Sequence, residues 1–253
     1  MFTRFCRAWL LSLAVLGGGC TSLPPGQDVM TSWEKAMVFV PGRTQAADIS
    51  FLNGFASKPL PVVIYLHGCS GITSHNDIPW AKYISDLGFV VILPDSLARR
   101  DRGLSCDPTT AQHFSATVHA RRLEEVAFTI DKVRSAAWAN GKNIFLMGHS
   151  EGGIATARTA ISGFRGAIIS GWTCTAPYPS FDGIFLPLDT PILTMGWDMD
   201  PWYYGGRYQG SCQTKFANRA KPKHLQFSGR EHSTSHIPAA KEALATFLKE
   251  NLQ

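Results

Sequence analysis

Five short apolar runs, none interrupted by a charged residue, constrain how this chain can fold. They are Pro61–Leu66, Phe89–Leu93, Asn143–Leu146, Gly166–Ser170 and Pro191–Gly196. Continuous apolar runs of this length are typical of strands that are buried on both faces. Helical segments lie between several of them, and such alternation calls for helices packed on a sheet. The sequence therefore predicts an α/β fold with a mostly parallel central sheet and helices on both faces.

Further elements are expected on either side of these strands. Met37–Val40 and Ile49–Leu52 are predicted to be strands at an antiparallel edge of the sheet, joined by a Pro-Gly turn. The predicted helices are Asp77–Leu87, Ala116–Trp138, Thr214–Arg219 and Ala239–Leu252, with a last strand at Lys223–Phe227. Within the second of these helices, His119 shares a face with apolar residues and is predicted to pack in the core.

The N-terminal residues are expected to lie outside the folded domain. Residues 1–20 begin with a short cationic stretch and continue with an apolar core of signal-peptide length. Residues 21–33 are polar and are predicted to be a linker or tether. Residues 34–253 contain no repeat and no low-complexity region, and are predicted to form one domain.

The end of the export segment, Leu16-Gly17-Gly18-Gly19-Cys20, resembles a bacterial lipobox, which implies a lipid anchor at Cys20. The leucine stands four residues before the cysteine instead of the usual three, so ordinary cleavage of a periplasmic or secreted protein is the alternative. Thr21 gives no aspartate-type signal for retention in the inner membrane. The resemblance therefore implies an outer-membrane lipoprotein of the cell envelope.

The cysteine count and the net charge indicate which covalent links and which partners to expect. Four cysteines stand outside the export segment (Cys69, Cys106, Cys174 and Cys212), and an even number in an exported protein predicts two disulfides with three possible pairings. Their spacing fits no compact zinc motif. The net charge of +5 is not gathered into a basic run, so nucleic acid is not expected as a partner.

The strongest indication of a catalytic residue in this sequence is the segment Gly148-His149-Ser150-Glu151-Gly152. It stands between a predicted strand and a run of good helix formers, and a serine between two glycines in that setting is typical of a nucleophile elbow. Glycines at both ends let the strand and the helix approach closely. The backbone N–H of Glu151 would then point to where an oxyanion forms. The alternative is a tight turn in which the serine caps the helix.

A serine nucleophile needs a base and an acid that orients the base. Asp198 and Asp200 both follow the fifth apolar run, and His232 lies beyond the predicted strand Lys223–Phe227. We choose His232 as the base, with His236 as the fallback. We choose Asp200 as the acid because an Asp-Pro sequence is frequent at this place in such folds, and Asp198 is the alternative.

A glycine-containing loop, His67-Gly68-Cys69-Ser70-Gly71, follows the first apolar run directly. Its position suggests that the backbone N–H of Cys69 pairs with that of Glu151 as an oxyanion donor. The thiol of Cys69 is instead expected in a disulfide, because it does not stand on the elbow.

These segments resemble the dienelactone hydrolase branch of the α/β-hydrolase superfamily over roughly residues 35–250. The stretches that carry the resemblance are Leu66–Gly71, Leu93–Ser96, Gly148–Gly153 and Gly229–His232. It implies an α/β-hydrolase fold, no metal and no organic cofactor, and the expected elements leave no room for a large cap domain. The name-giving enzymes use a cysteine nucleophile, whereas this chain has Ser150, so a serine esterase is expected instead of dienelactone turnover.

The expected reaction is hydrolysis of a carboxylic ester through an acyl-enzyme, acting on a small molecule or on the end of a polymer. Trp172, Trp197 and Trp202 follow predicted strand ends and are the predicted substrate-binding residues. Two alternatives remain open: a peptidase or amidase of the same fold, and a non-catalytic binding lipoprotein of the envelope.

Mass spectrometry of the mature N-terminus tests the predicted lipid anchor. We expect an acylated Cys20 as the first residue, because the segment before it resembles a lipobox. An unmodified N-terminus at another residue would show ordinary signal-peptide cleavage instead.

Overall fold

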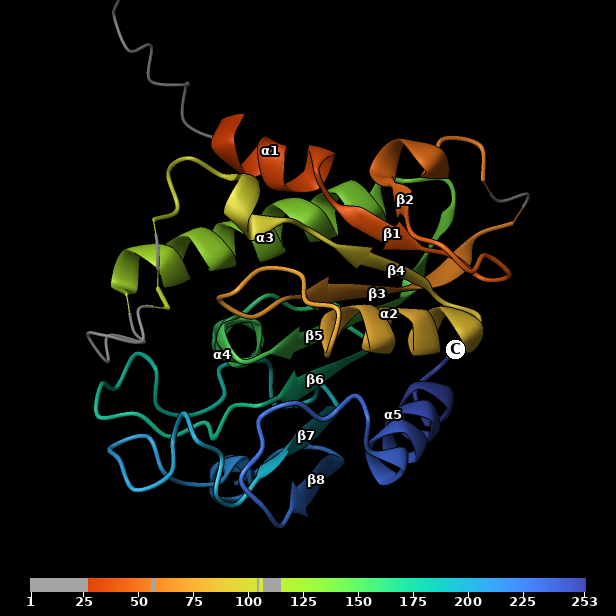
Figure 1. Cartoon of the computed structure of the whole chain (residues 1–253). Helices are drawn as coiled ribbons and strands as arrows, with labels where there is room; N and C mark the ends of the chain where they lie inside the picture. Colours follow the sequence, from red (N-terminus) through yellow and green to blue (C-terminus); the bar gives the residue numbers. More distant parts are fainter. Residues whose placement is uncertain (1–26, 56–57, 104, 107–114) are drawn as a thin grey trace, which may run out of the picture.

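The computed structural model describes residues 27–55, 58–103, 105–106 and 115–253, and within these residues eight strands form one sheet (Figure 1). The strands are β1 (Met37–Phe39), β2 (Ala47–Asp48), β3 (Leu60–Leu66), β4 (Val90–Leu93), β5 (Ala139–His149), β6 (Gly166–Ser170), β7 (Ile192–Trp197) and β8 (Pro222–Phe227). Their order in the sheet is β2-β1-β4-β3-β5-β6-β7-β8. β1 is antiparallel to both of its neighbours, and the pairs from β4 to β8 are parallel. The predicted mostly parallel sheet is confirmed.

Helices cover both faces of this sheet. The helices are α1 (Gln27–Glu34), α2 (Asp77–Asp86), α3 (Ala116–Arg134), α4 (Glu151–Arg158) and α5 (Pro238–Glu250), with short 3-10 helices η1 (Ile49–Leu52), η2 (Ser96–Ala98) and η3 (Cys212–Lys215). Helices α3 and α4 pack on one face, with α1 against α3, while α2 and α5 lie on the other face (Figure 1). The predicted layer arrangement is therefore confirmed as well.

The central strands have apolar side chains on both faces, which explains their unbroken hydrophobic sequences. In β3, Ile64 packs into the core beneath α3 with Ile130, and its neighbour Tyr65 packs into the opposite core with Trp80 of α2. Successive side chains of a strand point to opposite faces, so a strand between two helical layers needs apolar residues at every position.

Two predictions near the N-terminus are wrong. Part of the predicted tether is helix α1, because Val29, Ser32 and Trp33 stand on one face of it and pack against the domain. The backbone N–H of Asp95 also donates to the carbonyl of Ser32 (2.9 Å). The predicted strand Ile49–Leu52 is the 3-10 helix η1, which turns Leu52 into the core.

Two predicted helices have different bounds. α3 ends at Arg134 instead of Trp138, because the chain there turns to join the sheet, where Leu60 N–H donates to the Trp138 carbonyl (2.9 Å). The predicted helix Thr214–Arg219 is replaced by the shorter η3. Residues 1–20 and Cys20 lie outside the described residues.

The four cysteines form two disulfides, Cys69–Cys106 and Cys174–Cys212. This resolves the three pairings that the sequence left open. Disulfides persist in oxidising compartments, so they indicate a location outside the cytosol.

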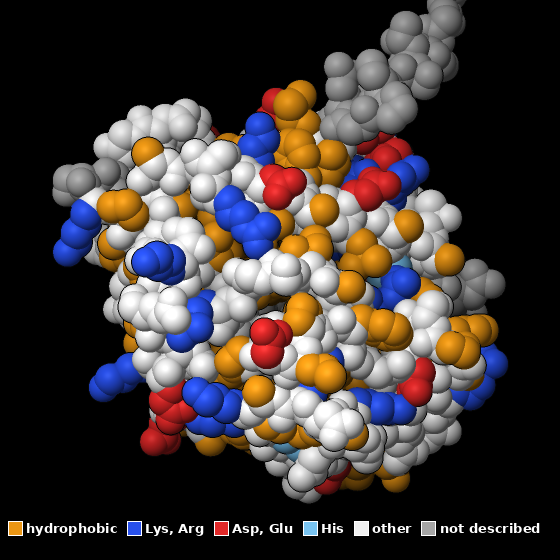
Figure 2. Space-filling model, turned by 180° about the vertical axis from the view of Figure 1, so that it is seen from behind, with side chains coloured by type: hydrophobic (Ala, Val, Ile, Leu, Met, Phe, Trp, Pro, Cys, Tyr) orange, Lys and Arg blue, Asp and Glu red, His pale blue; other side chains and the backbone are white. Residues whose placement is uncertain are grey.

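The surface is mixed in character. On the face shown in Figure 2, basic, acidic and apolar side chains are interspersed, and none of these kinds covers that face continuously. No helix in the described ranges is both long and apolar enough to cross a membrane.

Leu146 tests how strongly the double-sided core holds the sheet together. It is fully buried in β5, so Leu146→Ala is expected to lower the free energy of unfolding by about 2–5 kcal/mol, through lost burial and a cavity. Leu188 is 55% exposed, and Leu188→Ala is the matched control, with an expected change within about 0.5 kcal/mol. Urea denaturation measures both; equal losses in the two variants would contradict this account of the core.

Candidate active site

Ser150 occupies a sharp turn between the end of β5 and the start of α4. Its backbone has φ 56° and ψ −119°, a conformation that residues other than glycine rarely adopt. The Ser150 N–H donates to the carbonyl of Ser170 in β6 (2.9 Å), which holds the turn against the sheet. The predicted strand, turn and helix are thus present.

Glycines around this turn allow a very close approach of α4 to the sheet. A Cβ atom on Gly148 would overlap the Gly152 carbonyl, and one on Gly152 would overlap the Leu66 carbonyl in β3. Gly153 has the same relation to the Ser170 carbonyl. The expectation that glycines are needed for close strand-to-helix contact is confirmed.

His232 lies in the loop between β8 and α5, beside one of the two candidate acids. Its Nδ1 is 2.6 Å from Oδ2 of Asp200, whose side chain is almost fully buried. The other carboxylate oxygen of Asp200 accepts the backbone N–H of Trp202 (3.0 Å). The His232 Nε2 atom is buried and has no hydrogen-bond partner within the described residues. This leaves Nε2 available to a hydroxyl in the cleft.

Asp198 faces a different set of partners. Its carboxylate accepts the backbone N–H of Gly229 (2.9 Å) and the hydroxyl of Ser228 (2.9 Å), and both lower the pKa of Asp198. Its backbone N–H donates to Phe227 (2.9 Å). Asp198 therefore joins the ends of β7 and β8, and the structure places Asp200 against His232.

The fallback histidine is turned away from this arrangement. His236 Nε2 lies 2.9 Å from Glu231, and both side chains are about half exposed. Its ring stacks on Trp197 with 6.3 Å between the ring centroids. The structure brings His232 to Asp200 and leaves His236 on the surface.

Ser150 and His232 open on one cleft of about 180 Å³. It is lined by Gly68, Cys69, Ser70, Thr73, His75, Asp77, His149, Ser150, Trp202, His232 and Ser233. The motif pointed to the loop after β3, but His75 and Asp77 were not predicted, since no local pattern marks them. His149, beside the nucleophile, is buried, and its burial holds its pKa well below the usual value.

Of the three predicted substrate-binding tryptophans, the structure brings Trp202 to this cleft. Trp172 is buried and packs edge-on against Tyr203, with 5.2 Å between ring centroids. The indole N–H of Trp197 donates to the Ser233 carbonyl (2.9 Å), which fixes the loop that carries His232. Trp172 and Trp197 thus pack against residues that surround the cleft instead of lining it.

The loop after β3 lies directly against the elbow. A Cβ on Gly68 would lie 3.4 Å from the Cβ of Ser150. The Ser96 N–H donates to Nε2 of His67 (3.0 Å), so the proton of this imidazole is on Nδ1, which donates to the Gly68 carbonyl (2.6 Å). Burial, together with Arg122, holds the pKa of His67 well below its usual value, so the ring stays neutral. The neutral ring braces the loop that carries Cys69.

The side chain of Glu151 points away from the cleft. It is buried, and its carboxylate pairs with Arg102 and Ser105 and lies 3.7 Å from Arg122. Burial alone would raise the pKa of Glu151, but Arg122 and Arg102 lower it below the usual value. The backbone of Glu151 therefore stands beside Ser150, while its charge is neutralised inside the protein.

Arg122 of α3 connects this carboxylate to the loop after β3. It is fully buried, donates to the His67 carbonyl (2.8 Å), and pairs with Glu125 (3.1 Å). One guanidinium thus contacts the segment that precedes Cys69 and lies beside the side chain of Glu151. Through Arg122, helix α3 therefore contacts both segments that carry the predicted oxyanion donors.

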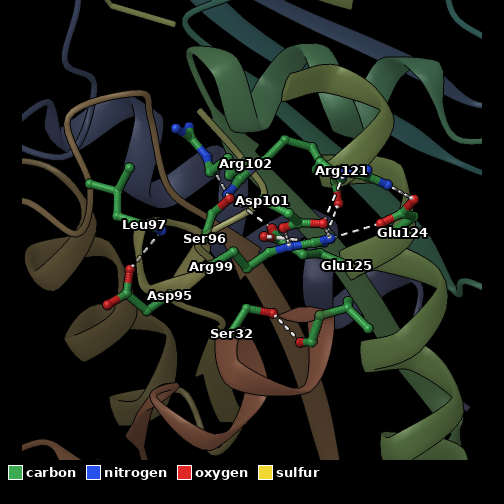
Figure 3. Close-up of polar contacts among 12 residues, drawn as sticks. Ser32, Asp95, Ser96, Leu97, Arg99, Asp101, Arg102, Arg121, Glu124 and Glu125 are labelled. Atoms are coloured by element: carbon green, nitrogen blue, oxygen red, sulfur yellow. Dashed lines mark hydrogen bonds and ion pairs between the residues drawn. The ribbon is translucent and has the colours of Figure 1, made fainter. Parts of the chain in front are cut away.

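A second part of this charge cluster anchors the segment between β4 and α3 (Figure 3). Arg99 donates to Asp101 (2.9 Å) and to Glu124 (2.8 Å). Arg102 donates to the hydroxyl of Ser96 (2.7 Å). Together with the Cys69–Cys106 disulfide, these contacts hold Arg102 and Ser105 against Glu151 at the start of α4.

His119 is placed as its sequence pattern predicts. It is fully buried, with its ring edge-on to Phe181 at 4.9 Å between centroids. Burial lowers the pKa of His119 to about 4.

Comparison with known proteins places this site in a family. The sequence model described as "Dienelactone hydrolase family" matches residues 50–180, more than half of the 253 residues. The chain belongs to the dienelactone hydrolase family. The matched segment contains Cys69 and Ser150. It ends before Asp200 and His232, so the match covers the predicted nucleophile but not the predicted acid and base.

Solved structures similar to this family member share its fold. A protein assigned as a dienelactone hydrolase from Klebsiella pneumoniae is 13% identical with a TM-score of 0.60, over 85% of this chain and 92% of that one. An esterase from Pyrobaculum calidifontis is 16% identical with a TM-score of 0.56, over 88% and 89%.

A phospholipase/carboxylesterase from Dyadobacter fermentans is 17% identical with a TM-score of 0.55, over 85% of this chain and 96% of that one. No curated protein sequence matches the chain. At these identities the structural likeness concerns the fold, which confirms the predicted α/β-hydrolase architecture.

Glu151 tests the buried charge cluster. Glu151→Gln leaves Arg102 and Arg122 short of a buried counter-charge, and is expected to lower the free energy of unfolding by about 3–5 kcal/mol at pH 7. Glu124→Gln is the matched control, since Glu124 is a half-exposed partner of Arg99, and the expected loss is below about 1 kcal/mol.

The effect of Glu151 should also depend on pH. Because its folded-state pKa is lowered, its contribution is present above the unfolded pKa of about 4.3 and is lost as pH falls through the folded value. Denaturation of wild type and Glu151→Gln from pH 7 down to pH 3 measures this. A difference that grows on acidification would contradict the ion pair.

Proposed function

We propose that this member of the dienelactone hydrolase family is a serine esterase that cleaves carboxylic esters. The observation that carries the proposal is the arrangement at one cleft. Ser150 and His232 line it together, His232 Nδ1 is 2.6 Å from Asp200, and the buried Nε2 has no partner within the described residues. A serine, a base and an orienting acid in this chain order fit the α/β-hydrolase pattern.

His232 would act as the general base. Its Nε2 removes the Ser150 proton as the hydroxyl attacks the ester carbonyl, and the imidazolium then protonates the leaving alcohol. Asp200 holds the Nδ1 proton and stabilises the positive ring. Water repeats the sequence on the acyl-enzyme and releases the acid.

The backbone N–H groups of Cys69 and Glu151 would stabilise the tetrahedral oxyanion. Their placement is supported by the loop after β3 and the start of α4, which meet at Ser150. Loss of one such donor typically costs on the order of 3 kcal/mol of barrier.

The cleft favours a small ester or the end of a polymer. Its volume of about 180 Å³ accommodates only part of a drug-sized molecule, and Trp202 offers an aromatic wall that is 36% exposed. Glu151 adds no negative charge to the cleft, since it is paired with Arg102. The net charge of +5 is not concentrated in a basic run, and on the face shown in Figure 2 basic and acidic side chains are interspersed, so nucleic acid is not proposed as a partner.

We also propose that the enzyme works in the cell envelope, with Cys20 as its lipid anchor. The support is the lipobox-like segment in the sequence, together with the two disulfides, which suit an oxidising compartment.

A panel of nitrophenyl esters tests the proposed reaction. Wild type should hydrolyse short-chain esters, and Ser150→Ala should lose activity to background, because it lacks the nucleophile. A fluorophosphonate probe should label wild type and not Ser150→Ala. Cleavage of aminoacyl anilides in preference to esters would contradict the proposed ester specificity. A folded wild-type protein that is not labelled and hydrolyses no substrate would refute the proposal that it is an enzyme.

The two neighbouring aspartates supply a matched pair for the acid. Asp200→Asn should lower kcat by about 10³–10⁴-fold, since the amide no longer orients the ring and stabilises the imidazolium. Asp198→Asn should stay within a few-fold of wild type, because Asp198 contacts Ser228 and Gly229 instead of His232. The reverse order would show that Asp198 is the acid.

A further inference from the structure

A small cavity adjoins the cleft on one side of Ser150. Its volume is about 20 Å³, room for about one water-sized atom. It is lined by Cys69, Cys106, Ser150, Glu151, Ile154, Trp202 and Tyr203. Both residues whose backbone N–H groups are the predicted oxyanion donors therefore line it, together with the nucleophile. A single carbonyl oxygen matches its size.

The chemistry of the lining leaves few polar side chains for such an oxygen. The sulfur atoms of Cys69 and Cys106 are joined, Ile154 is apolar, and the Glu151 carboxylate is engaged by Arg102. Hydroxyl groups among the lining residues come from Ser150 and Tyr203.

Tyr203 is held rigidly in this position. It is 6% exposed, and its backbone N–H donates to the Asp200 carbonyl (3.0 Å). Its ring lies edge-on to Trp172 and to His232, with centroids 5.2 and 6.0 Å away. Its side chain lines the same small cavity as Ser150. A tyrosine ring that is buried and packed against two other rings loses little further freedom when it binds a reacting group.

The environment of Tyr203 keeps it a hydrogen-bond donor. Burial, together with the negative charge of Asp200, raises its pKa well above the usual value, so the phenol stays protonated throughout the pH range in which an esterase works.

We propose that Tyr203 is a further catalytic residue, whose hydroxyl donates a third hydrogen bond to the oxyanion in this cavity. The proposal rests on the proposed function, because it requires Ser150 to be the nucleophile. It adds one side-chain donor to the two backbone donors, from the loop that also carries Asp200.

The chemical step is balanced without a change in the protonation of Tyr203. As the bond from Ser150 Oγ to the carbonyl carbon forms, the C=O π pair moves onto oxygen and the serine proton moves to His232 Nε2. Tyr203 donates its O–H to the new oxyanion and keeps its own proton. As the adduct collapses, an oxyanion lone pair forms the C=O bond again, the electron pair of the breaking C–O bond goes to the leaving oxygen, and His232 Nε2 gives that oxygen its proton. The donor thus acts on charge that exists mainly in the transition state.

Tyr203→Phe removes this hydroxyl and keeps the ring. With nitrophenyl acetate as substrate, we expect kcat to fall by about 10²–10³-fold, the usual cost of one oxyanion donor, with KM within a few-fold of wild type. The affinity of phenylboronic acid, which forms a tetrahedral adduct with an active serine, should fall together with kcat. Tyr204→Phe is the matched control: Tyr204 is adjacent and 50% exposed, so both readouts should match wild type.

Each other outcome overturns the inference in a recognisable way. A Tyr203→Phe variant with wild-type kcat shows that the hydroxyl is not a donor to the oxyanion, and a raised kcat shows that it holds Ser150 in a resting position. A lower thermal midpoint with unchanged boronate affinity per folded molecule shows a structural role. Absence of activity in wild type itself would instead refute the proposed function, so the two failures are distinguishable.

Discussion

The close contact between α4 and the sheet is the constraint on which the site depends. Gly148, Gly152 and Gly153 have no Cβ atoms, and a Cβ on any of them would overlap a backbone carbonyl. This contact supports Ser150 in a backbone conformation that costs on the order of 1–3 kcal/mol on its own. It also sets the first turn of α4 beside the loop after β3. The nucleophile and its predicted oxyanion donors are positioned by backbone packing, which leaves their side chains free for other contacts.

A buried charge cluster extends this order to the loops around the cleft. Arg122 donates to the His67 carbonyl and lies beside the Glu151 carboxylate, so one helix constrains both segments. Buried ion pairs add little net stability, but removal of one partner is costly. Such a network resists rearrangement more than it stabilises the fold. The Cys69–Cys106 disulfide constrains the same region covalently.

The sequence predicts which segments form the site but not the direction in which each of their side chains points. The sequence places Asp198 and Asp200 after the same predicted strand. In the structure their carboxylates point in different directions. Asp198 faces the next strand end at Gly229, while Asp200 faces His232. Trp172 and Trp202 likewise follow strand ends, yet one is buried and the other lines the cleft. Tyr203 belongs to no motif, and its place in the cavity beside Ser150 depends on a loop whose path no local pattern predicts.

Apolar runs and glycines are enough to predict the layered α/β fold and the glycine-flanked turn at Ser150, because both act through short-range geometry. The pattern of strands and helices also placed His232 and both aspartates at the sheet edge where Ser150 stands. Three features become visible when the chain is folded: the disulfide pairing, the burial of the Glu151 side chain, and Asp200 as the neighbour of His232. Those features depend on contacts between segments far apart in the chain, and a side chain's direction there follows from the packing of loops.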